Sequence, residues 1–174
     1  MPTIRTLIDA QAIAYRVKSL GAAISHAHRG HDLVLISVLK GSFVFAADLI
    51  RAIEIPVAVD FLACQSYGAG TETSGVVKIT HDLTQPIEGK HVIVVEDIID
   101  TGLTMSYLLS NLETRKPASL EVCALLHKPA RSRVKVPIHY LGFTIEDVFV
   151  VGYGLDFAER YRNLPYIGVL EEER

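Results

Sequence analysis

Residues 91–104 read HVIVVEDIIDTGLT, and this stretch decides the fold. Four apolar β-branched residues follow His91, as is typical of a strand that is buried on both faces of a parallel sheet. A polar turn comes next, and from Met105 onward apolar residues recur with the spacing of a helix. A buried strand that passes through a short turn into a helix is the repeating unit of α/β proteins, so the stretch predicts an α/β fold.

Strands and helices alternate on either side of that stretch. The continuous apolar run Leu33–Leu39 predicts another buried strand. The remaining strands are expected at residues 56–63, 76–80, 120–126, near 138–141, at 148–151 and at 166–170. Helices are expected at residues 8–20, ended by Gly21, and after Ser42. This order predicts one domain, residues 1–174, with a mainly parallel central sheet flanked by helices.

The composition is that of a globular protein. Of the 174 residues, 49% are hydrophobic and 21% are charged, and the net charge is −3. A chain with this balance has no overall positive field, so neither nucleic acid nor an anionic membrane is expected as a partner. Cys64 and Cys123 lie among apolar residues and are expected to be buried thiols. Because no signal-peptide pattern or membrane-length apolar run is visible, a cytoplasmic location is expected.

The turn that contains Gly102 suits a phosphate group. A helix N-terminus offers unpaired N–H groups and a partial positive charge, and Gly102 would let the backbone close around a phosphate. The hydroxyls of Thr101 and Thr104 add hydrogen-bond donors. The glycine and lysine spacing of a Walker loop is absent. The turn therefore predicts a site for a phosphate monoester.

Three carboxylates precede or enter this turn. Glu96 and Asp97 are adjacent, and they suit two vicinal hydroxyls or a hard cation. A diol beside a phosphate indicates ribose 5-phosphate, which leaves Asp100 to handle a proton of the base. The alternative is that these acids cap the following helix and balance its dipole. Their place at a strand end, where open α/β sheets bind ligands, favours the ligand site.

The same residues resemble a known family. Val92–Thr104 closely resembles the phosphoribosyl pyrophosphate motif of type I phosphoribosyltransferases, in particular the shorter, bacterial-type hypoxanthine–guanine members. Four more segments match in family order: Leu39–Gly41 the pyrophosphate loop, in which a cis peptide precedes the lysine, Ser66–Lys78 the flap, Leu125–Lys128 the purine-reading strand end, and Phe149–Arg162 the hood. The resemblance implies the type I phosphoribosyltransferase fold, with a small hood from the N-terminal and C-terminal segments and a mobile flap at about residues 64–78.

The resemblance implies roles at the ribose-phosphate end of the site. Glu96 and Asp97 would bind the ribose hydroxyls, directly or through Mg²⁺, and Asp156 would help to hold a second Mg²⁺. Asp100 would act as general acid/base at N7 of the purine. The 5′-phosphate would be held by Thr101, Gly102, Leu103 and Thr104. Some family members carry a lysine at the position of Leu103, so the phosphate site of this chain lacks the positive charge of that lysine.

Other implied roles concern the purine and the pyrophosphate. Lys128 would donate to the 6-oxo group, Phe149 would stack on the ring, and the backbone of Val150 would read the ring edge. Arg162 would face the pyrophosphate. The pyrophosphate loop and the flap would contribute Lys40, Gly41, Ser66 and Tyr67. From the residues alone, Lys40 reads as a surface lysine, Lys128 equally well as a strand end in solvent, and Phe149 as a core residue.

The seven histidines are not expected to bind a metal. His26 and His28 are two residues apart, beside Arg29 and His31, and the spacing is not convincing for a zinc site. This segment is interpreted as a solvated stretch of the surface.

The expected reaction transfers the 5-phosphoribosyl group from phosphoribosyl pyrophosphate to N9 of a 6-oxopurine, hypoxanthine and/or guanine. The products would be IMP or GMP and pyrophosphate, in purine salvage, with Mg²⁺ as cofactor. Family habit implies a homodimer or a homotetramer. The alternatives are a transferase for adenine, uracil or orotate, and a nucleic-acid-binding regulator of the same fold. Lysine can only donate a hydrogen bond, which suits an oxopurine, and the net charge argues against the regulator.

Overall fold

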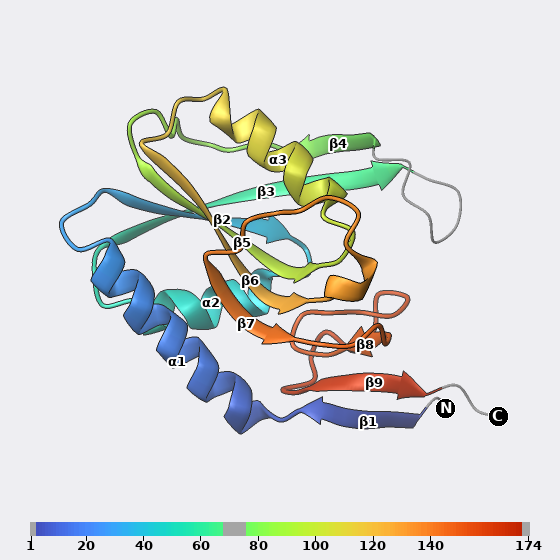
Figure 1. Ribbon diagram of the computed structural model, residues 1–174. Helices are drawn as coiled ribbons and strands as arrows, with labels where there is room; N and C mark the ends of the chain where they lie inside the picture. The colour runs from blue at the N-terminus through green and yellow to red at the C-terminus, as the bar shows by residue number, and fades with distance from the viewer. Residues whose placement is uncertain (1–2, 68–75, 172–174) are drawn as a thin grey trace.

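A six-stranded sheet forms the centre of the computed structural model, which describes residues 3–67 and 76–171 (Figure 1). Its strands lie in the order β4-β3-β2-β5-β6-β7, and all neighbours are parallel except β4, which runs antiparallel to β3. The bounds are β2 Leu33–Leu39, β3 Val57–Tyr67, β4 Val76–His81, β5 His91–Ile99, β6 Ser119–His127 and β7 Tyr140–Thr144. The predicted α/β fold with a mainly parallel sheet is confirmed.

Helices cover both faces of this sheet (Figure 1). On one face lie α1 (Ala10–Ala27) and α2 (Phe43–Ala52), and on the other lies α3 (Leu103–Glu113). Each face has its own apolar core: Phe45 of α2 and Leu125 of β6 belong to one cluster, and Leu108 of α3 and Ile36 of β2 belong to the other. A short 3₁₀ helix, η1 (Pro129–Arg131), follows β6. None of the helices within the described ranges has the length and hydrophobicity to cross a membrane.

A second, three-stranded sheet joins the two ends of the chain (Figure 1). Its order is β1-β9-β8, with β1 Thr3–Ile8, β8 Val150–Val151 and β9 Ile167–Glu171, and both pairings are antiparallel. Strand β1 was not predicted, since its residues show neither strict alternation nor a continuous apolar run. That the terminal segments act as a hood over a base stays a prediction.

The first helix departs from the sequence-based prediction. It does not end at Gly21 but continues to Ala27. A Cβ atom on Gly21 would lie 2.5 Å from the carbonyl oxygen of Ala52 in α2. Gly21 is therefore a contact residue that lets the two helices approach closely. The sequence analysis misread Gly21 as the end of the helix, because the role of this glycine depends on a tertiary contact and not on the local sequence pattern.

The substitution Gly21→Ala is expected to destabilise the protein, although alanine normally favours a helix by about 1 kcal/mol over glycine. The added methyl group has no space and must push α1 away from α2, for a net loss of about 1–2 kcal/mol in the free energy of unfolding. Urea denaturation measures the effect. The exposed neighbour Ala22, changed to glycine, reports helix propensity by itself. A gain in stability for Gly21→Ala would contradict the tight contact.

The chain order places two turns side by side at one edge of the sheet. From the central pair, the chain passes from β2 through α2 to β3, and from β5 through α3 to β6, so the two connections leave in opposite directions. The two connecting helices also lie on opposite faces. Open α/β sheets bind ligands in the crevice that forms at such a reversal. Here the crevice lies between the carboxyl ends of β2 and β5.

Candidate active site

The turn after β2 lies against the acidic end of β5. The peptide bond between Leu39 and Lys40 is cis, as the resemblance implied. A Cβ atom on Gly41 would lie 1.7 Å from a carboxylate oxygen of Asp97, so the acidic side chain fills the space that any other residue would need. Gly154, with φ +98°, packs in the same way against the carbonyl of Gly41. Lys40, Gly41, Asp97 and the segment around Gly154 therefore meet at one point.

Glu96 and Asp97 form a strained electrostatic pair. Glu96 is buried, and burial raises its pKa well above the ordinary value, with a further contribution from the neighbouring Asp97 carboxylate. Burial also raises the pKa of Asp97, which is opposed by hydrogen bonds such as the one its Oδ1 accepts from the Ile98 N–H at 2.8 Å. A hard cation or the hydroxyls of a sugar would stabilise the ionised pair. The donor set thus fits Mg²⁺, which prefers carboxylate and water ligands.

The predicted phosphate turn leads directly into α3. Gly102 has φ +84° and is the N-cap residue, and a side chain there would meet the Val134 carbonyl. The first turn of α3 contains no acidic residue, and Glu96 and Asp97 accept hydrogen bonds from N–H groups of their own strand. The alternative that these two acids cap the helix is therefore wrong. A small cavity of about 80 Å³ opens at this turn and is lined by residues that include Glu96, Asp100, Thr101, Gly102 and Thr104.

The predicted flap begins beside this turn. Ser66 and Tyr67 are the last residues of β3, and Ser66 is exposed. The hydroxyl oxygen of Ser66 lies 3.3 Å from that of Thr104 at the start of α3. Residues 68–75 of the predicted flap lie outside the described residues. Leu103 lies next to Thr104, and its N–H donates to the Thr101 hydroxyl at 3.4 Å.

A chain of alternating charges surrounds Asp100. Arg131 of η1 places its Nε 2.8 Å from the Asp100 carboxylate, and its Nη1 3.8 Å from Asp147. Lys128 lies 3.9 Å from Asp147, and only 9% of its side chain is exposed. The alternative that Lys128 ends in solvent is therefore wrong. Arg131 and Asp147 were not identified from sequence, although Pro129 signals the turn that brings Arg131 back toward Asp100.

The hood segment presents an aromatic pair to solvent. Phe149 is 52% exposed, so the alternative that it belongs to the core is wrong. Its ring lies edge-on to Phe157, with centroids 5.8 Å apart and an interplanar angle of 85°. Phe157, which the sequence analysis missed, is also exposed. The next residue, Val150, is buried and pairs with Val169 of β9, which anchors Phe149 to the small sheet.

Ion pairs organise the remaining predicted residues. Arg162 contacts Asp156 at 3.1 Å and donates to the carbonyl of Gly154 at 2.7 Å. Lys40 contacts Glu159 at 3.1 Å, and both side chains are largely exposed. Asp156 is thus paired with an arginine as the structure stands, and its predicted contact with Mg²⁺ stays a prediction. These contacts place Arg162 and Asp156 next to the Lys40–Gly41 turn.

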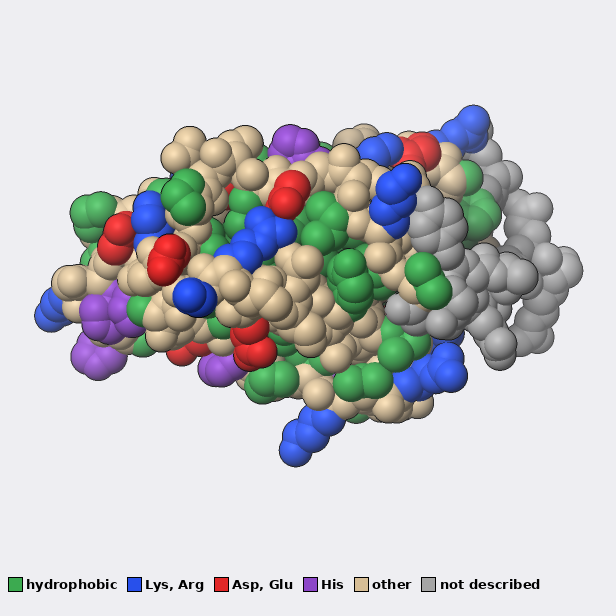
Figure 2. All heavy atoms as spheres, turned by 90° about the horizontal axis from the view of Figure 1, so that it is seen from above, with side chains coloured by type: hydrophobic (Ala, Val, Ile, Leu, Met, Phe, Trp, Pro, Cys, Tyr) green, Lys and Arg blue, Asp and Glu red, His purple; other side chains and the backbone are tan. Residues whose placement is uncertain are grey.

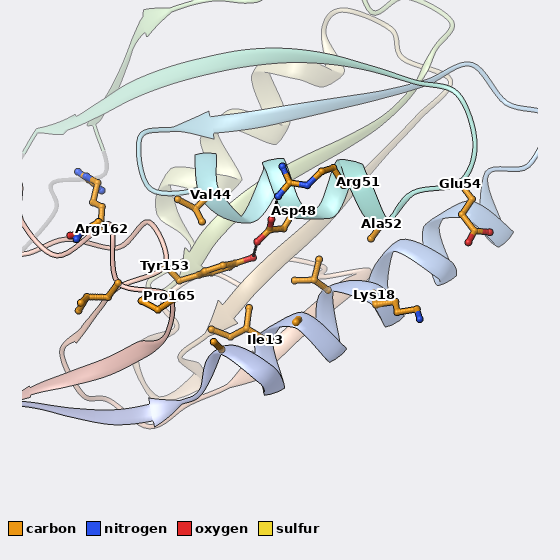
Figure 3. Close-up of a pocket in the computed structure, with 15 residues that line it drawn as sticks. Ile13, Lys18, Val44, Asp48, Arg51, Ala52, Glu54, Tyr153, Arg162 and Pro165 are labelled. Atoms are coloured by element: carbon orange, nitrogen blue, oxygen red, sulfur yellow. Dashed lines mark hydrogen bonds and ion pairs between the residues drawn. The ribbon is translucent and has the colours of Figure 1, made fainter.

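A larger cavity of about 760 Å³ lies between α1, α2 and the segment 153–165 (Figure 3). Figure 3 shows Tyr153 and Asp48 pointing toward one another, with Arg51 beside them; the tyrosine hydroxyl donates to Asp48, which also pairs with Arg51. Burial raises the pKa of Tyr153, and the contact with Asp48 adds to this. Among the predicted site residues, Arg162 lines this cavity, whereas Glu96, Asp100 and Thr104 line the small cavity at the start of α3. The predicted ribose-phosphate chemistry therefore belongs to the small cavity.

The comparisons with known proteins agree with this geometry. Residues 4–158 match the phosphoribosyl transferase domain. The chain belongs to the phosphoribosyl transferase family. It is 50% identical over 171 residues to the hypoxanthine-guanine phosphoribosyltransferase of Mycobacterium avium, covering 95% of this chain and 84% of that protein. It is 48% identical over 168 residues to the hypoxanthine phosphoribosyltransferase of Escherichia coli K12, covering 95% and 94%.

Solved structures of this family have the same fold. The hypoxanthine-guanine phosphoribosyltransferase of Bacillus anthracis superposes with a TM-score of 0.93 and 50% identity, covering 97% of this chain and 99% of that chain. A hypoxanthine phosphoribosyltransferase of Staphylococcus aureus also gives a TM-score of 0.93, with 44% identity over 96% of this chain and 91% of that chain. The predicted type I phosphoribosyltransferase fold is confirmed.

The acidic pair of this family member is expected to lower its stability in the absence of ligands. Glu96→Gln removes one buried charge, so it should raise the free energy of unfolding by on the order of 1 kcal/mol near pH 8. The gain should vanish below the ordinary pKa of glutamate, where Glu96 is protonated in both the folded and the unfolded chain, and it should grow as the pH rises from that ordinary value towards the raised pKa. Urea unfolding at several pH values measures it, with the exposed Glu88→Gln as the matched control. If Glu96→Gln and Glu88→Gln changed the free energy of unfolding equally at every pH, the electrostatic strain between Glu96 and Asp97 would be contradicted.

Proposed function

We propose that this chain transfers the 5-phosphoribosyl group from phosphoribosyl pyrophosphate to N9 of a 6-oxopurine, hypoxanthine and/or guanine, and releases pyrophosphate. The products are IMP or GMP, and the reaction belongs to purine salvage. The observation that carries the proposal is one crevice that combines the Glu96–Asp97 pair, the N-terminus of α3 and the turn at Gly41. The names of the relatives, at 48–50% identity over nearly the whole chain, support the choice of a 6-oxopurine.

The reaction breaks the bond between ribose C1′ and the pyrophosphate oxygen and forms the bond between C1′ and purine N9. Glu96 and Asp97 accept hydrogen bonds from the ribose hydroxyls and thereby orient the sugar. The N–H groups at the start of α3, with the hydroxyls of Thr101 and Thr104, hold the 5′-phosphate. Because C1′ gains positive charge as the leaving group departs, nearby carboxylates also favour the transition state.

The leaving pyrophosphate carries several negative charges, and we assign Mg²⁺ as the cofactor that neutralises them. Glu96 and Asp97 would hold one ion, directly or through water and the sugar, and Asp156 would help to hold a second. Support comes from the buried Glu96–Asp97 pair, whose raised pKa values reflect the cost of charge without a counterion. On the protein side, Lys40 belongs to the turn and Arg162 contacts the same glutamate, Glu159, as Lys40 does, and both would face the same pyrophosphate.

Asp100 is proposed to accept the proton that purine N7 loses. Its ion pair with Arg131 fixes the carboxylate beside the small cavity at the start of α3. We assign Arg131 as a positioning residue, because it contacts Asp100 and not the predicted phosphate turn.

The substitution Asp100→Asn is expected to lower turnover by on the order of 10²-fold or more, because asparagine keeps the shape but cannot accept the proton. Binding of phosphoribosyl pyrophosphate should change little. Steady-state kinetics and equilibrium binding separate the two effects. Asp147→Asn is the matched control, since Asp147 contacts the same arginine from the other side, and it should cost less than about 10-fold. Near-normal turnover of Asp100→Asn would remove Asp100 from the chemistry.

Lys128 and Phe149 are proposed to bind the purine. An ammonium group donates to a 6-oxo oxygen but faces a donor amine in adenine, so adenine should be refused. Phe149, exposed and braced by Phe157, offers a face for stacking. The backbone of Val150 would form hydrogen bonds with the edge of the purine ring.

The substitution Lys128→Ala is expected to weaken purine binding by about 10–100-fold, the usual range for a lost hydrogen bond to a charged group. The affinity for phosphoribosyl pyrophosphate should remain within a few-fold, because that ligand is held at the other side of the crevice. The KM for hypoxanthine and the Kd for phosphoribosyl pyrophosphate are the two measurements. Equal losses in both would point to a structural role for Lys128 instead.

The deciding experiment incubates phosphoribosyl pyrophosphate and Mg²⁺ with hypoxanthine, guanine, xanthine or adenine in parallel. Nucleotide formation with an oxopurine, and none with adenine or without metal, is the expected result. Tight binding of phosphoribosyl pyrophosphate without turnover of any base would favour the regulator. A cytoplasmic location and assembly into a homodimer or homotetramer remain predictions from the family resemblance.

A further inference from the structure

Three histidines converge at the end of the sheet opposite the candidate active site. His28 is the C-cap of α1, His31 lies in the turn that follows, and His91 is the first residue of β5. The His91 N–H donates to the carbonyl of Asp32 at 3.0 Å, which ties the turn to β5. One nitrogen of each of the three rings lies within 4.8 Å of the others. Figure 2 shows histidine side chains gathered at the left end, where β2 and β5 begin in Figure 1.

The interpretation of this segment as solvated is wrong for His28. Its side chain is 3% exposed, and its Nε2 lies 2.8 Å from a carboxylate oxygen of Glu121 on β6. Its other ring nitrogen, Nδ1, is buried and, within the described residues, has no hydrogen-bond partner. A buried polar atom without a partner is costly in free energy, so a ligand bound to Nδ1 of His28 would remove this cost.

The environment of His28 resembles that of a metal-binding histidine. Such residues donate one ring N–H to a carboxylate, which fixes the tautomer and directs the lone pair of the other nitrogen to the metal. The contact between Nε2 and Glu121 leaves Nδ1 of His28 as the ligand atom. In the same way, Nδ1 of His91 lies 2.7 Å from the Ser119 hydroxyl, which leaves Nε2 of His91 as the ligand atom.

We propose that His28, His31 and His91 form a binding site for a divalent transition metal, with Zn²⁺ as the representative ion. Imidazole nitrogens suit Zn²⁺, Ni²⁺ and Cu²⁺, whereas Mg²⁺ prefers oxygen ligands. The site is therefore separate from the carboxylates of the candidate active site in both position and chemistry. Three histidines leave the fourth tetrahedral position to water.

A small movement of His31 completes the geometry. Zn–N bonds of about 2.0–2.1 Å in a tetrahedral site put the ligand nitrogens about 3.4 Å apart, so separations of at most 4.8 Å must close by no more than roughly 1.4 Å. The rings of His31 and His91 now stack with centroids 4.0 Å apart, and parallel rings cannot both direct in-plane lone pairs at one ion. His31 is exposed and can turn, while Glu121 and Ser119 hold the other two rings.

A bound ion would join the end of α1, the turn before β2 and the start of β5, so the metal should stabilise the folded state by linkage.

The test is equilibrium dialysis of the chelator-treated full chain against Zn²⁺ without substrates, followed by elemental analysis. The native chain should hold a zinc ion that His31→Ala lacks or binds more weakly by at least roughly 100-fold, more than is usual for the loss of an outer contact. His26→Ala is the matched control, because His26 is exposed on the same helix and outside the cluster. It should bind zinc like the native chain.

Two further measurements separate this site from other zinc-binding groups. Zn²⁺ should raise the melting temperature of the native chain and of His26→Ala, and should have less effect on His31→Ala. Glu121→Gln should weaken zinc binding by about 10-fold, since it removes the carboxylate that orients His28. The Mg²⁺-dependent reaction should be the same for His31→Ala and the native chain, which also shows that the variant folds.

Two outcomes would overturn the proposal. In one, the native chain takes up no zinc under these conditions. In the other, the native chain, His26→Ala and His31→Ala show equal zinc content and equal shifts in melting temperature, which would place the zinc at other groups.

Discussion

The parallel pairing of β2 with β5 is the constraint on which both ends of the molecule depend. Both strands are almost wholly buried, and their register sets Leu33 opposite His91 and Ser37 opposite Val95. At the carboxyl ends, this register brings the Gly41 turn against Asp97. At the amino ends, it brings the turn after α1 against His91. One apolar interaction thus assembles two polar clusters at opposite edges of the sheet.

The candidate active site is held under electrostatic strain by this apolar frame. A buried Glu96 beside Asp97 opposes folding, because both lose hydration and repel one another. The hydrophobic clusters on both faces of the sheet offset that cost. A hard cation or hydrogen-bond donors such as vicinal hydroxyls would relieve this strain. The backbone adds conformational strain at non-glycine residues with positive φ angles, several of which lie in one segment: Tyr153, Ala158, Glu159 and Tyr161.

The sequence alone predicted the features that depend on residues close together in the chain. The run 91–104 specified a strand, an acidic end and a helix start, and the structure has them as β5 and α3. The missed features depend on partners far away in the chain. Arg131 belongs beside Asp100 because η1 folds back, and Gly21 is a helix residue because Ala52 packs on it. His91 joins His28 through strand register, which no spacing between histidines reveals.

The pairing of β1 with β9 has a consequence for synthesis of the protein on the ribosome. Strand β1 leaves the ribosome early, but its pairing partner β9 is among the last residues described. Until β9 emerges, the edge of β1 remains without its partner, and Phe149 and Arg162 lack the finished sheet that frames them. The central sheet can form first, since its strands are complete by residue 144. A nascent chain therefore completes the small sheet only after the central sheet, and until then the segment that carries Phe149 lacks its pairing with β9.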